Sequence, residues 1–335
     1  EQARAAAGAG AADASVIVAD AADEAALAAL AARTKVVLST AGPFALYGSA
    51  LVAACVAHGT HYCDITGETP WVRDLIDRHH DQAARDATRI VPCCGFDSVP
   101  SDIGALLVAA EVQRSSGAPC VGVKACHSIR GGINGGTLAS ILHIASAGDL
   151  ERFDQPFLLN PEGSAPADVS PHEDALGPRH DADFDAWLAP FVMARINTRV
   201  VRRSAALAGG DGPYAPGFVY QEFLRSGRGP RAGAIATVLA LGLGSGRTAL
   251  HFGPWRAAAT ALAGRVLPGP GQGPSQREIE QGSTRCELIG QAADGTTLRG
   301  RIACQGDPGN RATTIFVCEA ALALAGDARQ LPGGA

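Results

Sequence analysis

Residues 39–43 have the composition of a turn that comes close to a bound ligand. The turn follows an apolar stretch and consists of Ser39, Thr40, Ala41, Gly42 and Pro43. Small side chains and a glycine let the backbone approach a ligand, and proline fixes the course of the turn. An ordinary strand-to-helix turn uses some of the same residue types, so both interpretations stay open at this point.

Three further side chains could bind or react, and each has a structural alternative. Tyr47 follows in the same loop, and its phenol could donate to an oxygen on which negative charge develops, unless it is a packing aromatic. Glu68 could position a ligand or accept from a ribose, or it could cap a helix. Asp20 could accept from an adenine amine, unless Asp20 or Asp23 caps the helix that follows.

The densest polar run next to an apolar strand is 93–102. Gly95 permits a sharp exit from the strand, and the backbone amides of Gly95 and Phe96 could donate to a substrate oxygen. Helix capping explains other polar residues of this run, but it explains Asp97 less well. We therefore predict that Asp97 belongs to the reaction site, where it orients a cofactor or the following helix.

The elements that position these residues alternate regularly. Apolar stretches of about five residues are separated by helical stretches of about ten, which indicates βαβ units and a parallel sheet. The predicted strands are 15–19, 35–39, 61–65 and 89–93, and the predicted helices are 23–32, 49–58 and 71–87. Because the carboxyl ends of parallel strands face one crevice, we expect the polar segments to meet there. The pattern is typical of a doubly wound dinucleotide-binding domain.

The glycine-rich phosphate-binding turn of such a domain is missing from its expected place. No GxGxxG run lies between a predicted strand and a helix, although this turn normally follows the first strand. If 15–19 is the third strand of the usual order, the strands that join it to 35–39 precede residue 1. The sequence therefore predicts that about 40 to 50 residues of the domain lie upstream.

Charge and cysteine content disfavour several classes of protein. The net charge is −5 and no basic block occurs, so nucleic acid is not an expected partner. Nine cysteines without a CxxC pair predict reduced thiols in the cytoplasm. His58 and His61 lie on different predicted elements, so no metal site is expected. Without a histidine nearby in sequence, Cys93 and Cys94 are not expected to be nucleophiles.

An uncharged, glycine-rich run at 232–246 could contact a membrane. It spans fifteen residues, fewer than the ~20 that cross a bilayer. We expect a core helix beneath a sheet, and the alternative is a helix in the headgroup layer that gives peripheral membrane contact. The proline-rich, acidic stretch 156–185 is expected to be a solvated surface loop rather than a lid.

Six segments of the chain resemble the saccharopine dehydrogenase-like oxidoreductases. The matching segments are 38–48, 58–68, 94–102, 131–137, 268–275 and 306–310. The most specific of them is the run Gly-Phe-Asp-Ser-Val-Pro-Ser-Asp at 95–102. Within this family the chain is most similar to the trans-acting enoyl reductases, which serve the assembly of polyketide-derived lipids.

The resemblance implies an NADP (or NAD) cofactor and an α/β fold in two parts. A partial Rossmann domain is expected over 1–110 and a substrate domain on an antiparallel sheet over 111–310. A C-terminal helix within 311–335 is expected to pack back on the first domain. The sequence itself supports the sheet, because 284–291 and 297–304 alternate in polarity around a hairpin turn.

The resemblance further implies hydride transfer to an electron-poor carbon. This carbon is either the β-carbon of an enoyl thioester or ester, or an imine carbon, on a small or lipid-linked substrate. Tyr47 or solvent would supply the proton, and residues 39–43 with Gly95 and Phe96 would hold the cofactor. Residues expected at the substrate are Glu68, Asn134, Gly135 and Thr137. A homodimer is one assembly to test, and the alternative function is a non-catalytic nucleotide- or lipid-binding protein at a membrane surface.

Overall fold

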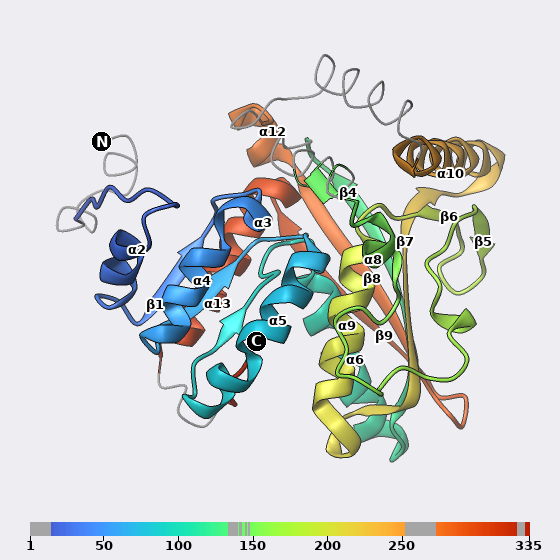
Figure 1. Ribbon diagram of the computed structural model, residues 1–335. Coiled ribbons are helices and arrows are strands. Elements are labelled where there is room, and N and C mark those ends of the chain that lie inside the picture. The colour runs from blue at the N-terminus through green and yellow to red at the C-terminus, as the bar shows by residue number, and fades with distance from the viewer. Residues whose placement is uncertain are drawn as a thin grey trace.

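The computed structural model describes residues 15–132, 140, 143–144, 146, 148–251, 273–326 and 332–335. It contains a parallel sheet of three strands and a mixed sheet of six. Figure 1 shows the small sheet with helices on both of its faces and the large sheet beside it. The predicted α/β fold, with a Rossmann-like parallel sheet and a second part built on another sheet, is confirmed.

The small sheet has the predicted βαβ connectivity. Its strands β1 (Val36–Ser39), β2 (His61–Asp64) and β3 (Ile90–Val91) are parallel and adjacent in that order. Helix α4 (Ser49–Ala57) connects the first two strands, and α5 (Thr69–Arg85) connects the second and third. These elements, together with α2 (Glu24–Ala31), confirm the alternation predicted from residue 23 onward.

The apolar segment 15–19 does not form the predicted strand. It has no regular secondary structure, and Val16 and Val18 are 74% and 94% exposed. A β-strand needs a partner that satisfies its backbone groups, and within the described residues β1 pairs on one side only, with β2. Hydrophobic patterning cannot tell whether a partner strand lies alongside, which is why this prediction is wrong. The expectation of an upstream segment stays a prediction.

Helix α13 (Thr313–Ala325) covers one face of the small sheet. Its Val317 and Leu324 pack with Cys63 of β2 in a buried cluster. Helices α4 and α5 lie on the opposite face (Figure 1). The end of the chain also returns to this sheet, where Arg89 and Gly334 form an isolated bridge. The sheet is therefore covered on both faces, as parallel sheets require.

The large sheet has the strand order β5-β6-β7-β4-β8-β9. Neighbouring strands are antiparallel except β4 and β7, which are parallel. The sheet is thus mixed instead of antiparallel, because the chain between β4 and β7 crosses over before it pairs again. The predicted hairpin is confirmed as β8 and β9. The strands are β4 (Cys120–Arg130), β5 (Arg179–Asp181), β6 (Ala186–Pro190), β7 (Tyr214–Gly227), β8 (Ser283–Ala292) and β9 (Thr297–Gln305).

Helices α6 (Val99–Ser116) and α9 (Ala194–Ala208) pack against the large sheet. Helix α6 follows the loop after β3, so it links the strand ends of the small sheet to the large one. It lies so close to the hairpin that a Cβ on Gly300 would come within 2.4 Å of Val108 Cγ2. The boundary predicted at residue 110 falls inside this helix. The shorter helices are α3 (Phe44–Tyr47), α8 (Leu150–Asp154), α12 (Gln276–Gln281), η2 (Ser170–His172), η3 (Gly209–Asp211) and η4 (Pro308–Ala312).

Helix α10 (Gly229–His251) is not the core helix that we predicted. It packs on β6 through a narrow stripe of small residues, Ala232, Ala236 and Ala240. Much of its opposite side is exposed, including Val238 at 69% and Leu241 at 67%. It is also longer than the uncharged run, and by length and composition alone 229–250 could cross a membrane. The prediction failed because alanine and glycine make a helix apolar without making it bulky enough to need burial.

Candidate active site

A cavity of about 510 Å³ is lined by residues from both parts of the molecule. The small sheet contributes residues that follow the carboxyl ends of its strands: Thr40, Gly42 and Pro43 after β1, Ile65 and Gly67 after β2, and Asp97 after β3. Open α/β sheets bind their ligands in the crevice at this edge. The structure therefore brings the 39–43 turn and Asp97 together at one hollow.

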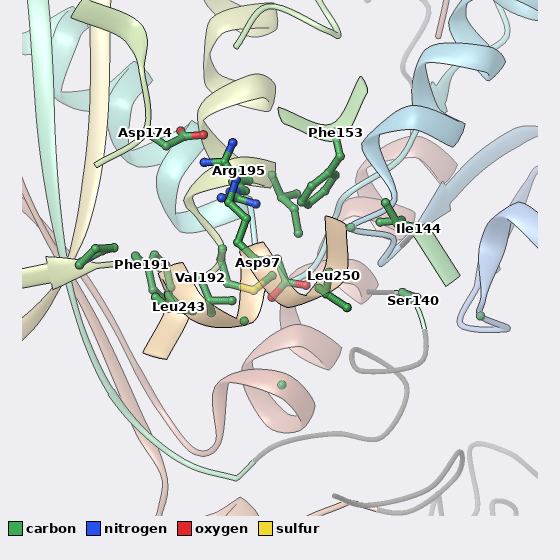
Figure 2. A pocket seen from close by; sticks show the side chains of 18 of the residues that line it. Asp97, Ser140, Ile144, Phe153, Asp174, Phe191, Val192, Arg195, Leu243 and Leu250 are labelled. Carbon is green, nitrogen blue, oxygen red and sulfur yellow. The ribbon is translucent and has the colours of Figure 1, made fainter. Parts of the chain in front are cut away.

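The other wall of the cavity is mainly apolar. Figure 2 shows Arg195 and Asp97 with Phe191 and Leu243 on one side and Phe153 on the other. Most of these residues come from α9, α10 and the loops before them. The stretch 156–185 contributes residues 174–176 to this wall, so it is not simply the solvated loop that we expected. Further residues of this wall are Ile144, Val192, Met193, Ile196, Arg247 and Leu250.

Glu68 holds the turn after β1 and does not line the cavity. Its side chain is 1% exposed, and its carboxylate accepts from the backbone N–H groups of Phe44 at 2.8 Å and Ala45 at 3.0 Å. Ser140 Oγ donates a third hydrogen bond at 2.7 Å. The carboxylate thus satisfies N–H groups that have no partner inside helix α3. Of the two interpretations, the capping role is the one that the structure supports, although the capped helix is α3 rather than α5.

Asp64 ties the ends of β2 and β3 together. Its buried carboxylate accepts from Thr66 N at 3.0 Å, Cys93 N at 3.1 Å and the Tyr62 hydroxyl at 2.9 Å. Burial raises the pKa of Asp64 to about 7, although these hydrogen bonds act in the opposite direction. The loop that carries Asp97 is therefore fixed where it leaves β3.

Asp97 presents its carboxylate to the cavity. The residue is partly buried, and neither a hydrogen bond nor an ion pair joins its side chain to the described part of the chain. Burial, followed by the nearby Glu222 carboxylate, raises the pKa of Asp97 to about 6. A carboxyl group with a pKa near neutrality can keep a proton and release it to a reacting atom. This position differs from the orienting role that the sequence suggested.

Glu222 of β7 belongs to a buried polar cluster. Its Oε2 accepts from Ser101 Oγ at 2.8 Å and from the Tyr220 hydroxyl at 2.9 Å, and its Oε1 accepts from Asn197 Nδ2 at 2.7 Å. A buried carboxylate is tolerated when its oxygens are satisfied in this way. The cluster therefore fixes the carboxylate that, after burial, contributes to the raised pKa of Asp97.

His127 of β4 joins the same cluster and supports the cavity wall. Its Nε2 lies 3.4 Å from Glu222 Oε2 and 3.7 Å from Cys286 Sγ. Burial acts to lower the pKa of His127, but Cys286 and Glu222 raise it to about 10. The ring of Phe191, which lines the cavity, stacks on this imidazole with centroids 4.6 Å apart. Polar groups of the large sheet thus position an apolar surface of the cavity.

Two predicted site residues lie away from the cavity lining. Tyr47 is 49% exposed at the end of α3 and is not among the residues that line the cavity. Asp20 accepts from Ala22 N at 2.9 Å in a local turn, and Asp23 caps α2 by accepting from Ala26 N. The capping alternative therefore holds for Asp23. Asp20 closes the turn before it, and its contact with an adenine stays a prediction.

The backbone amide of Phe96, after β3, is also arranged differently from the expectation. The Phe96 N–H donates to Thr313 Oγ1 at 3.0 Å, so it does not serve as a free oxyanion donor. Gly95 is buried against the same Thr313 side chain. Ser39 is buried too, and its Oγ accepts from Ala41 N at 3.4 Å. The predicted residues Asn134, Gly135 and Thr137 lie outside the described residues.

Sequence reasoning missed Arg195, Phe191 and Glu222. Each is placed by long-range packing, and none stands in a run of unusual composition. The only local signal was the recurrence of arginine in 195–203, which is spaced for one side of a helix. The described residues contain no group of three or more His, Cys, Asp or Glu side chains that could hold a metal ion.

Comparisons with known proteins agree with this architecture. Residues 1–91 match the family described as the saccharopine dehydrogenase NADP-binding domain. A putative trans-acting enoyl reductase of Mycobacterium tuberculosis (strain ATCC 25618 / H37Rv) is 39% identical over 327 residues, which cover 94% of this chain and 77% of that protein. A trans-acting enoyl reductase of Mycobacterium ulcerans (strain Agy99) is 37% identical over 333 residues, with the same coverage of 94% and 77%.

Solved structures resemble the chain more distantly. Apo saccharopine dehydrogenase (L-Glu forming) from Saccharomyces cerevisiae has a TM-score of 0.46 and 12% identity, over 95% of this chain and 82% of that one. The amine dehydrogenase from Mycobacterium smegmatis has a TM-score of 0.39 and 11% identity, over 94% of this chain and 77% of that one.

The NADP-binding match and the crevice at the ends of a parallel sheet define the class of protein as an NAD(P)-dependent oxidoreductase. The similar proteins identify the family within this class. Because identity of 34–39% extends over nearly the whole chain, the chain belongs to the family of trans-acting enoyl reductases. The resemblance drawn from the sequence motifs is thereby confirmed.

Proposed function

We propose that the protein reduces the carbon–carbon double bond of an enoyl thioester or ester in the cavity between its two parts. One observation carries this proposal: the turn after β1 and Asp97 line the same cavity, whose remaining wall is mainly apolar. A reduced nicotinamide supplies the hydride when it is bound. NADPH is the expected form, because the matching family is an NADP-binding domain.

The turn after β1 fits a nicotinamide and its ribose. Thr40, Gly42 and Pro43 line the cavity with small side chains, so the backbone is open to a flat ring. Glu68 and Ser39 support the turn from inside the protein. In this arrangement Thr40 and Gly42 contact the cofactor, and Glu68 keeps their backbone in place.

Asp97 is the proton donor in this proposal. The α-carbon of the substrate needs a proton after hydride reaches the β-carbon. Asp97 faces the cavity, and burial together with Glu222 raises its pKa to about 6. At neutral pH a fraction of about one tenth of such groups is protonated, which is enough for general acid catalysis.

The apolar wall favours an enoyl chain over an imine. Phe153, Phe191 and Leu243 offer surface to hydrocarbon, and burial of each methylene contributes about 0.8 kcal/mol. An amino-acid-like imine would need several polar partners for its charged groups. A lipid-linked enoyl group therefore fits this wall better.

Absorbance of NADPH tests the proposal directly. The purified chain is mixed with NADPH and trans-2-octenoyl-N-acetylcysteamine, a soluble enoyl thioester, and the saturated thioester is sought by mass spectrometry. We expect NADPH oxidation that requires the enoyl compound and yields one saturated product per NADPH. A second reaction contains 2-oxooctanoate and ammonia. Oxidation in that mixture alone would assign imine reduction instead.

We also propose that the exposed apolar side of α10 lies against a lipid surface. Val238 and Leu241 point away from the protein, whereas Leu243 and Leu250 of the same helix line the cavity. A lipid-linked substrate could thus pass from a membrane into the cavity along one helix. The test is flotation with vesicles of phosphatidylcholine and phosphatidylglycerol. Light scattering that gives twice the mass of the chain would assign this side to a homodimer instead.

A cytoplasmic location completes the proposal. All nine cysteines are unpaired thiols. Disulfides form and persist in oxidising compartments and are rare in the cytosol. Thiol labelling of the protein in intact cells and after denaturation would measure this directly, with nine reduced thiols expected.

A further inference from the structure

Four arginines of helix α9 lie on its inner side. Three of them bind the preceding loop, and the fourth lines the cavity. Arg199, Arg202 and Arg203 donate to a carboxylate or to backbone carbonyl groups of the preceding loop at 2.6–2.8 Å. These three clamp the loop onto the helix. Arg195 lines the cavity, and its one ion pair within the described residues joins Nη1 to Asp154 Oδ1 at 3.0 Å.

The surroundings of Arg195 make it a strong hydrogen-bond donor toward the cavity. Its side chain is 22% exposed, in the first turn of α9. Burial lowers the pKa of Arg195 and Asp154 acts in the opposite direction, yet a guanidinium keeps its charge at neutral pH. The flanking Asp174 is already paired with Arg199 at 2.6 Å. Donors of Arg195 that Asp154 does not use are therefore left for a ligand.

We propose that Arg195 binds the carbonyl oxygen of the enoyl substrate and stabilises the enolate that forms there. This inference rests on the proposed enoyl reduction. Hydride adds to the β-carbon, the electron pair of the double bond moves through the α-carbon onto the carbonyl oxygen, and the nicotinamide is oxidised. A proton then adds to the α-carbon, and the carbonyl group is restored.

The arrangement of the cavity favours this assignment. Arg195 and Asp97 both line the cavity (Figure 2), and the proposal assigns the carbonyl oxygen to Arg195 and the α-carbon to Asp97. Two of the donors expected from sequence are not available there, because Tyr47 is exposed outside the lining and the Phe96 amide donates to Thr313. A guanidinium also stabilises an enolate oxygen better than a neutral donor does.

The inference sets a requirement on the substrate. The double bond must be conjugated to a carbonyl group, because Arg195 acts on the oxygen that receives the charge. A thioester, an ester or a ketone meets this requirement, and an isolated alkene does not. The chemical class is therefore an α,β-unsaturated carbonyl compound with an apolar chain.

The experiment compares Arg195→Gln and Arg195→Lys with the unchanged protein on trans-2-octenoyl-N-acetylcysteamine. Arg195→Gln should lower kcat and kcat/KM by similar factors of about 10²–10³, the loss typical of a missing oxyanion donor. Arg195→Lys keeps a charge and should recover at least about tenfold of that loss. Asp154 keeps Arg247 as a partner at 2.9 Å, so the glutamine variant should fold with an unchanged Tm.

The control variant is Arg228→Gln, which removes an exposed guanidinium paired with Asp185 at the start of α10 and should leave both constants unchanged. NADPH affinity, measured by fluorescence, should be equal in all variants. A rise in KM at constant kcat would overturn the inference, since it would show ground-state binding only. If the unchanged protein reduces no enoyl compound, the proposed function fails; if it does and Arg195→Gln matches it, only this inference fails.

Discussion

The two walls of the cavity are built in different ways. The wall at the strand ends consists of short turns, and Glu68 and Asp64 hold it by accepting from backbone N–H groups. The opposite wall consists of side chains such as Arg195 and Phe191, which α9 and its preceding loop present. A wall made from backbone is fixed by the fold, whereas a wall made from side chains can change one residue at a time.

This difference suggests a division of labour. A cofactor is the same in every turnover and suits a wall of backbone and small residues. A substrate varies in length and shape and suits a wall of replaceable apolar side chains. Asp97 belongs by sequence to the first wall, yet its pKa is raised first by burial and then by Glu222 of the large sheet. The acidity of Asp97 therefore depends on residues from both walls.

The largest expected effect comes from Asp97→Asn. An amide cannot donate a proton as an acid does, so kcat should fall by about 10²-fold or more. In the unchanged protein kcat should also fall about tenfold per pH unit above pH 6, because the acid form of Asp97 is lost as pH rises through its pKa. The measurement is kcat between pH 5 and pH 9 at saturating NADPH.

A matched control for this variant is Asp102→Asn. Asp102 lies one helical turn further along, accepts from Ser204 Oγ at 2.9 Å and is not part of the cavity lining. Its replacement should leave kcat within about twofold, the range expected of a residue that touches neither ligand. If Asp97→Asn keeps its activity and its pH profile, another group supplies the proton, and Asp97 has no role in the reaction that depends on both walls.

The next effect tests the backbone wall through Glu68→Ala. Removal of this carboxylate leaves two backbone N–H groups and Ser140 Oγ without their partner. We expect a loss of about 3 kcal/mol in the free energy of unfolding, the combined cost of unsatisfied buried donors, and weaker NADPH binding. Urea unfolding and NADPH titration measure both.

Glu111→Ala is the control, because Glu111 is an exposed carboxylate that pairs with Arg114 on α6. It should leave the urea midpoint of unfolding unchanged, because water and salt screen an exposed ion pair. Glu68→Gln keeps one acceptor oxygen, so its free energy of unfolding should lie between that of Glu68→Ala and that of the unchanged protein. Equal stability of Glu68→Ala and the unchanged protein would mean that the turn does not depend on this carboxylate.

The backbone wall was largely predictable from the sequence and the other wall was not. The strands β1, β2 and β3 and the turns after them follow from patterns within about ten residues, since turn chemistry is local. The same local reasoning could not decide between ligand and cap for Glu68. Its partners, Phe44 and Ala45, are more than twenty residues away, and only packing shows which N–H groups lack a partner.

The side-chain wall depends on contacts between distant elements. Arg195 and Asp97 are separated by almost one hundred residues, and no periodicity relates them. The apolar run in α10 was assigned to the core, because a hydropathy pattern does not show that small residues alone make the contact. The apolar segment 15–19 failed for a related reason, since pattern alone supplies no strand partner.

A smaller effect is expected from Leu243→Ala, which enlarges the side-chain wall. Leu243 lines the cavity, so its removal should shift the preference in kcat/KM toward longer enoyl chains by about fourfold per methylene accommodated. The control is Leu241→Ala on the same helix, where the side chain is 67% exposed and outside the lining. Thioesters of hexenoic, octenoic and decenoic acid measure the shift. Identical shifts in both variants would place the acyl chain elsewhere.

The smallest expected effect is the dependence of stability on pH. Burial raises the pKa of Asp64 to about 7 and those of Asp97 and Asp102 to about 6. Because these folded-state values exceed the ordinary one, the folded chain binds more protons than the unfolded chain between about pH 4 and pH 7, and stability must fall as pH rises through this window. The Tm should therefore be a few degrees higher at pH 5.5 than at pH 8, at about 2–4 °C per kcal/mol. Asp102→Asn should reduce this difference, whereas Asp211→Asn, exposed on η3, should not. A Tm that rises with pH in the unchanged protein and in Asp211→Asn would show that these carboxyl groups are solvated. It would also show that burial does not raise the pKa of Asp97.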